Sequence, residues 1–179
     1  MALIRPNDRA LQDITTLPTA VSSDFLASDV DVGKVVQVVN GSATNHSIFG
    51  SSTTYMQSGD TVTITPQSSS SKILVVFNTS AHLNTASTSG GVQRGYYTIF
   101  RGSTDIGSGN GDGVIMIRKY GNGATNHYAE FPMSIQVVDT PNTTSAITYE
   151  ARFKSEGGEE IGYSYDGFIR TFYAMEIAG

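Results

Sequence analysis

Short runs of β-branched and aromatic residues, separated by turn residues, recur along the chain from Gly33 onward. The separating segments hold Asn-Gly, Asp-Gly, proline and serine clusters, which favour turns and end strands. Roughly ten such runs follow one another at a spacing of about 8–15 residues, which leaves no room for long helices. The runs that we expect to form strands are residues 34–40, 45–49, 61–65, 73–80, 93–101, 114–120, 127–139, 146–154, 161–165 and 168–179.

This spacing predicts an all-β fold: an antiparallel β-sandwich of the jelly-roll kind, with a closed barrel as the alternative. The composition agrees, because Thr, Val, Ile, Tyr and Phe outnumber the Leu, Glu and Lys of helical proteins. The chain has 179 residues, which suits one domain with one core, and we expect the β-sandwich domain over residues 33–179. Pro132 predicts that the first half of the run 127–139 is an edge or a bulge.

Residues 1–32 differ from the rest of the chain and are expected to form an extended N-terminal arm. They hold two prolines and no alternating stretch, and at most one short helix fits between Asn7 and Pro18. The arm is too apolar for a solvated tail, so it either packs on its own domain or lies across a neighbouring subunit or a larger assembly. The residues that we expect in assembly contacts are Leu3, Ile4, Leu11, Ile14, Leu17 and Phe25.

Two runs, Ile73–Phe77 and Val114–Ile117, are apolar without a break. A strand with one wet face alternates between apolar and polar residues, so these runs indicate strands that are covered on both faces. A sandwich covers one face of each sheet, and a further copy of the chain is the simplest cover for the other. The alternative is that the arm covers these faces within one subunit. We expect a subunit interface at Leu74, Val76, Ile115, Ile117, Phe168 and Phe172.

The charge pattern excludes several classes of partner. The net charge is −5, from 11 basic and 16 acidic residues, whereas nucleic-acid binding normally needs a clustered basic face.

The absence of cysteine removes disulfides and thiolate metal sites. No apolar run is long enough to span a membrane, and the N-terminus lacks the apolar core of a secretory signal. We therefore expect synthesis in the cytoplasm and no nucleic-acid or membrane partner.

No pattern in the chain indicates an enzyme or a cofactor. The three histidines have no partner at metal-ligand spacing, so His46, His82 and His127 are expected to be polar surface or turn residues. The nucleophile motif G-x-S-x-G is absent.

Two acidic segments could support other chemistry. Asp105, Asn110 and Asp112 offer oxygen atoms that suit calcium, but their spacing does not match an EF-hand loop. We expect the segment 105–113 to be a flexible connection, and a metal ion there stays an open alternative. The acids between residues 156 and 160 lie on a Gly-Gly turn, where we expect solvated side chains rather than the facing pair of a glycosidase.

Several segments together resemble a group of virion proteins of tailed phages. They occur in the order "GKVVQVVN", "SSTTY", "VTITPQSSSSKILVVFNTS", "YYTIFRGSTDIG" and "DTPNTTSAITYEARFKS". The resemblance covers about residues 33–155, and its moderately specific elements are "TPQSSSSKILV" and "PNTTSAITY". It implies a homotrimeric β-sandwich head that is part of a virion.

The resemblance leaves two positions in the virion open. The first is the capsid surface, where the trimer is a decoration or cement protein that binds the major capsid protein and stabilises the head shell. The second is the tip of a tail fibre or another tail part, where loops 84–92 and 107–113 face a host receptor or glycan. A fibre normally has a stalk, and the chain shows neither heptads nor a collagen-like repeat, so we expect the decoration protein. Whether a metal ion lies on the trimer axis stays open.

Overall fold

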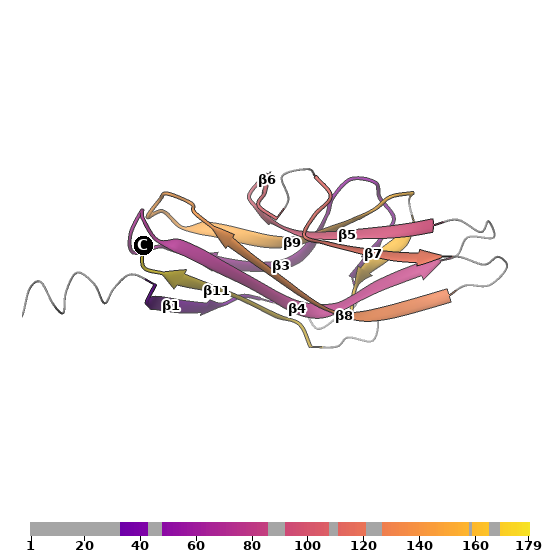
Figure 1. The fold of residues 1–179 in the computed structure, drawn as a ribbon, viewed down its shortest axis with the longest axis horizontal. Coiled ribbons are helices and arrows are strands. Elements are labelled where there is room, and N and C mark those ends of the chain that lie inside the picture. The colour runs from indigo at the N-terminus through magenta and orange to yellow at the C-terminus, as the bar shows by residue number, and fades with distance from the viewer. Residues whose placement is uncertain are drawn as a thin grey trace, which may run out of the picture.

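The computed structural model describes residues 33–42, 48–85, 92–107, 111–120, 127–157, 159–164 and 169–179. These residues form eleven strands in two antiparallel sheets that pack face to face (Figure 1). The predicted antiparallel β-sandwich is thereby confirmed. The described part of the chain holds no helix, and therefore none that could cross a membrane. The predicted arm and its short helix, residues 1–32, lie outside the described residues.

Sheet A is arranged around one long central strand, β4 (Lys72–Thr85). On one side, β8 (His127–Asp139) pairs with β4 along its whole length. On the other side, the first half of β4 pairs with β11 (Thr171–Ile177) and the second half with β10 (Glu160–Tyr163). On this second side the outermost strands are β1 (Val35–Asn40), next to β11, and β2 (Ile48–Gly50), next to β10.

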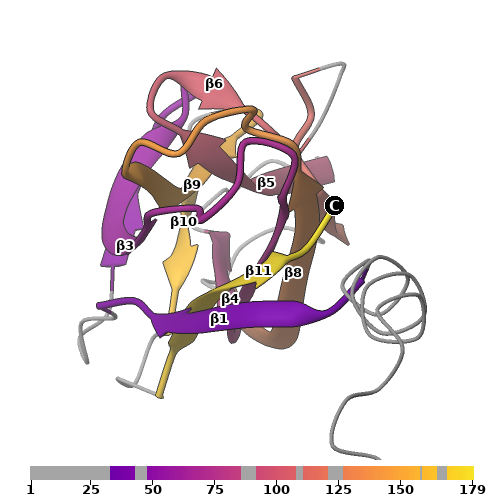
Figure 2. The same ribbon diagram turned by 90° about the vertical axis from the view of Figure 1, so that its left-hand side faces the viewer.

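Sheet B contains the remaining five strands. Its order begins at β3 (Met56–Ile64) and continues through β9 (Ile147–Ser155) to β5 (Val92–Arg101). Two short strands, β6 (Thr104–Asp105) and β7 (Ile115–Tyr120), pair with different ends of β5. Figure 2 shows sheet B stacked above the β1, β11 and β4 strands of sheet A.

The core between the sheets is apolar and aromatic. Tyr163 lies at its centre, with its ring 5.2 Å from Phe77, 5.4 Å from Tyr97 and 5.1 Å from Phe153. The Tyr97 hydroxyl donates to the His82 carbonyl at 3.0 Å, and burial raises the pKa of both tyrosines. The phenols therefore stay neutral and keep donating hydrogen bonds inside the core. The fully or nearly fully buried members of the core also include Val62, Ile64, Ile73, Val75, Leu83, Ile99, Ile135, Tyr149, Ile161 and Phe172.

The prediction for Pro132 is confirmed, because β8 is an edge strand. Its pairing with β4 runs without interruption from Thr85 opposite His127 to Ile73 opposite Asp139. Among the described strands of sheet A, β4 is the one that pairs with β8. Pro132 has no N–H to donate, and an edge position tolerates that loss.

A bulge in β3 carries a carboxylate into the interior. The register of β3 against β9 shifts between Gln57 and Thr61, and Gly59 within it has a φ of 76°. Asp60 is fully buried there, with its Oδ2 3.0 Å from the Nε of Arg170, which precedes β11 and is also buried. This ion pair joins the two sheets. The polar sequence before Thr61 resembled a turn, so the prediction placed the start of this strand too late.

Candidate assembly surface

The outer face of sheet A carries a row of apolar side chains across four strands. Val38 in β1 pairs with Met175 in β11, Met175 pairs with Leu74 in β4, and Leu74 pairs with Val138 in β8. Residues directly opposite in an antiparallel pair point to the same face of the sheet. Leu74 and Met175 are half-buried, whereas Val38 and Val138 at the ends of the row are 57% and 58% exposed.

The neighbouring row is uncharged as well. Asn40 pairs with Tyr173, Tyr173 with Val76, and Val76 with Gln136. We call these two rows together the apolar face, and its members are Val38, Asn40, Leu74, Val76, Gln136, Val138, Tyr173 and Met175. A charged residue, Lys72, borders the apolar face opposite Ile177. An uncharged patch across four strands is the kind of surface that proteins bury against a partner.

Of the predicted interface residues, Leu74 and Val76 point to the apolar face, and Val76 is 4% exposed because its neighbours within the chain already cover it. Phe172 does not, because it points between the sheets and is 2% exposed, as a member of the core of a single chain. Phe168 lies outside the described residues. The run Ile73–Phe77 thus has one face in the core and the other on the apolar face.

The two predicted interface residues of β7 do not lie on the apolar face of sheet A. Ile115 and Ile117 are partly buried and pack against the core of their own chain. Met116 between them points outward and is 44% exposed. The strand therefore alternates, and it reads as unbroken only because its outward position carries an apolar methionine.

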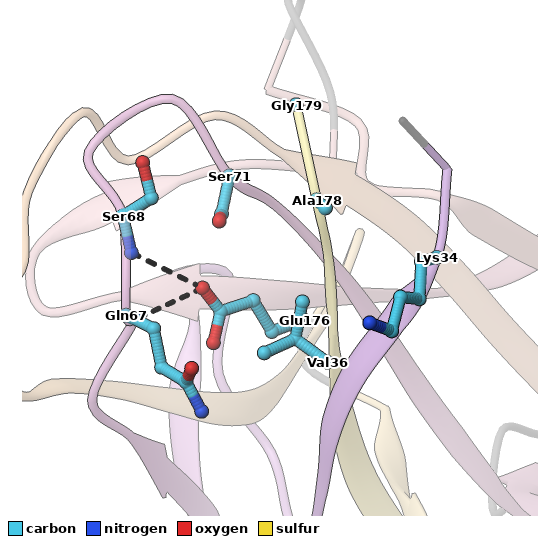
Figure 3. A pocket seen from close by; sticks show the side chains of 8 residues that line it. All are labelled: Lys34, Val36, Gln67, Ser68, Ser71, Glu176, Ala178 and Gly179. Carbon is cyan, nitrogen blue, oxygen red and sulfur yellow. Dashed lines mark hydrogen bonds between the residues drawn. The ribbon is translucent and has the colours of Figure 1, made fainter. Parts of the chain in front are cut away.

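A pocket of about 410 Å³ lies at the end of sheet A, between β11 and the serine-rich loop that joins β3 to β4 (Figure 3). Its lining residues are Lys34, Val36, Gln67, Ser68, Ser71, Glu176, Ala178 and Gly179. The carboxylate of Glu176, which is fully buried, points at the loop. Its Oε1 accepts from the backbone N–H of Gln67 at 2.8 Å and of Ser68 at 3.4 Å, and its Oε2 accepts from Gln37 Nε2 at 2.6 Å.

These contacts keep Glu176 ionised. Burial alone would raise its pKa, but hydrogen bonds from Gln37, Ser71, Gln67 and Ser68 outweigh burial and lower the pKa. Both carboxylate oxygens accept hydrogen bonds from the protein itself, so the group serves as an anchor for the loop and not as a proton donor. The sequence prediction treated the serine run as a solvated connection and missed this anchor.

His82 was expected at the surface and is buried instead. Its Nδ1 lies 2.8 Å from the Oε1 of Glu130 in β8, and its Nε2 lies 4.0 Å from the Oε1 of Glu160 in β10. The ring of Phe49 in β2 packs on it at 4.8 Å. His82 therefore links the second half of β4 to three neighbouring strands. His46 lies outside the described residues, and of His127 the structure describes the backbone.

The oxygen-rich segment near residue 105 is used internally. The Asp105 Oδ1 accepts from Thr98 Oγ1 at 2.6 Å and from the Gly107 N–H at 2.9 Å. Asp112 is exposed, and Asn110 lies outside the described residues. Where the structure describes the chain, no three His, Asp or Glu side chains gather closely enough to hold a metal ion.

The acids of the Gly-Gly turn have partners within the chain. Glu156 forms an ion pair with Arg94, and Glu160 accepts from Asn84 Nδ2 at 3.0 Å. Glu159 accepts from the Gly157 N–H at 3.0 Å. All three side chains stay at least partly accessible to solvent, and each also has a partner within the chain.

The outer face of sheet B is more polar and carries cation–aromatic contacts. The Nζ of Lys154 lies 4.7 Å from the centre of the Tyr55 ring and 5.2 Å from that of Tyr96. Arg152 lies over the ring of Phe100 at 4.4 Å. Two cations of this face thus lie over aromatic rings, whereas the apolar face of sheet A carries no charged side chain.

No protein-family model matches the chain, and no curated protein matches it in sequence.

Proposed function

We propose that this chain is a non-enzymatic structural protein of a tailed-phage virion. In this proposal it is a homotrimer that decorates the capsid, binds the major capsid protein and stabilises the head shell. The observation that carries the proposal is the apolar face. It supports self-association, and the resemblance of residues 33–155 to phage virion proteins supports the virion and the trimer.

Charge is the reason to place a second copy of the chain on the apolar face. Each copy has a net charge of −5, so two copies repel one another over most of their surfaces. The apolar face carries no ionised side chain, and its burial costs no charge desolvation. It is therefore the surface of sheet A where copies of an acidic chain approach one another most favourably.

A trimer stabilises a shell by simple physical means. Three weak contacts to neighbouring capsid subunits act together, because binding of the first raises the effective concentration of the other two. A protein that binds the assembled shell and not its separate subunits shifts the equilibrium towards the shell. No cofactor and no chemical step are needed for this role.

The arm provides the test of capsid binding. We expect that a variant without residues 1–32 folds and trimerises but no longer binds shells. Sedimentation of the purified variant with capsids that lack the protein measures its occupancy, and the full chain is the control. Full occupancy by the truncated protein would contradict the role of the arm, and a monomeric full chain would contradict the trimer.

Host-surface binding at the tail is the second candidate function. The outer face of sheet B favours it, because Tyr120 is 70% exposed there and lies near Met116 and Arg118 on the same strand. An exposed tyrosine offers an apolar ring and a polar hydroxyl, and such side chains are enriched at binding interfaces. Adsorption of virions that lack the protein distinguishes the two functions, since normal adsorption rules out the tail role.

A further inference from the structure

The two edge strands of sheet A are similar in sequence character. At one edge lies β1 and at the other lies β8, and in the described part of the chain neither has a strand on its outer side. Edge strands of single domains usually carry a lysine, a proline or a bulge that prevents pairing with other chains. β1 has the sequence VVQVVN, without charge or proline, and its one irregularity lies at its start, where its register against β11 shifts between Val35 and Gln37. The second half of β8 is similar, because its one charged residue, Asp139, is buried and bound to Arg101 at 2.8 Å.

The two edge strands also lie on the same rows of the sheet and run in opposite directions. Val38 and Val138 occupy one row of the sheet, and Asn40 and Gln136 occupy the next. Every pair from β1 through β11 and β4 to β8 is antiparallel, so β1 runs against β8 (Figure 1). When a copy is rotated about an axis roughly along the strands, its β8 arrives antiparallel to β1 of its neighbour. Such a head-to-tail contact closes into a ring when the rotation between copies divides a full turn, and otherwise extends as an open filament.

We propose that the β1 edge of one copy pairs with the second half of β8, Met133–Asp139, in the next copy. The pairing makes sheet A continuous between subunits and continues the apolar face from Val38 of one copy to Val138 of another. In the paired sheet the two most exposed side chains of the row, Val38 and Val138, become neighbours. The inference rests on the self-association in the proposed function and specifies which strands make the contact.

The absence of cysteine allows a direct test by disulfide cross-linking. Within one chain, Val38 and Val138 are three strand spacings apart, about 14 Å. A disulfide needs Cα atoms within about 7 Å, so these positions cannot bridge inside a chain. Val38→Cys is combined in turn with Val138→Cys, Gln136→Cys or Ser134→Cys, which are exposed and on the same face. The use of three partner positions allows for small differences in the register between β1 of one copy and β8 of the next.

We expect that, under mild oxidation, one of these pairs converts more than half of the protein into covalent oligomers. The largest covalent oligomer should contain three chains, and the cross-linking should persist when the protein is diluted. Each single-cysteine variant should stay uncross-linked. Met116→Cys combined with Thr148→Cys is the matched control on the outer face of sheet B, where we expect no cross-link.

Three results would overturn the inference, and they differ in what they say about the proposed function. Cross-linking of Val138→Cys alone would show that β8 pairs with β8, in a two-fold contact. No cross-link from any pair, while the wild-type protein sediments as a trimer, would exclude the β1–β8 contact and leave the proposed trimer intact. A wild-type protein that sediments as a monomer at all concentrations would overturn both.

Discussion

Single buried polar residues set the conditions under which this sandwich is stable. Glu176 is ionised inside the protein because two backbone N–H groups of the serine-rich loop and the Gln37 amide bind its oxygens. Its pKa is lower in the folded protein than in the unfolded chain. The hydrogen bonds thus stabilise the folded state while the carboxylate is charged, at any pH above its unfolded pKa. This stability is lost as the pH falls through the folded pKa.

This leads to a prediction for Glu176→Gln. The amide keeps the shape but puts an NH₂ group where an acceptor is needed, so we expect a loss of about 2 kcal/mol near neutral pH. The loss should shrink as the pH falls through the unfolded and then the folded pKa of Glu176, because the wild-type carboxylate becomes protonated first in the unfolded chain and then in the folded protein. Urea unfolding at a series of pH values measures both effects. An equal loss at every pH would show that the charge of Glu176 contributes nothing.

At the scale of elements, the corner between the sheets depends on one glycine. After β1 the chain leaves sheet A at Gly41 and reaches the edge of β3, where Ser42 pairs with Thr61. A Cβ atom on Gly41 would lie 2.3 Å from the Thr61 carbonyl oxygen and 2.9 Å from the Val62 Cβ. The close approach of two backbones therefore requires glycine at this position.

We expect Gly41→Ala to destabilise the fold by about 3 kcal/mol, because the backbone must move to accept the methyl group. Gly102→Ala is the matched control: its φ is 59° and its Cβ would meet open space, so it should cost about 1 kcal/mol. Thermal or urea unfolding compares the two. A loss at Gly41 no greater than at Gly102 would mean that the corner is less tightly packed than described.

Strands with regular alternation could be predicted from the sequence, and contacts between distant strands could not. The limits of β8 match the predicted run 127–139, and β9 lies within one residue of its prediction. The burial of His82 depends on Glu130, Glu160 and Phe49, which lie in three other strands. The sequence around His82 gives no indication of these neighbours. Phe172 was placed at the interface for the same reason, since its face is decided by the register of β11 against β4.

At the scale of the whole molecule, a new charge on the apolar face should oppose self-association. Val138→Glu places a carboxylate at the end of the apolar row, where a partner would have to bury it. We expect the dissociation constant of the oligomer to rise about 100-fold, which corresponds to about 3 kcal/mol. Sedimentation at several protein concentrations measures this change.

Met116→Glu is the control for Val138→Glu. Met116 is exposed to a similar degree, but it lies on the outer face of sheet B. Its substitution should leave the oligomer intact. A similar weakening by both substitutions would show that added negative charge alone, and not its place on sheet A, disrupts the oligomer.

The position of β11 in sheet A has a consequence for the timing of biosynthesis. β11 lies between β1 and β4, yet it leaves the ribosome after every other described strand. Until then β1 has no neighbour in sheet A, and the apolar face is interrupted between Val38 and Leu74. A nascent chain therefore lacks the complete apolar face. If copies associate as we propose, the continuous apolar row that joins β1 to β8 forms only after β11 has been made.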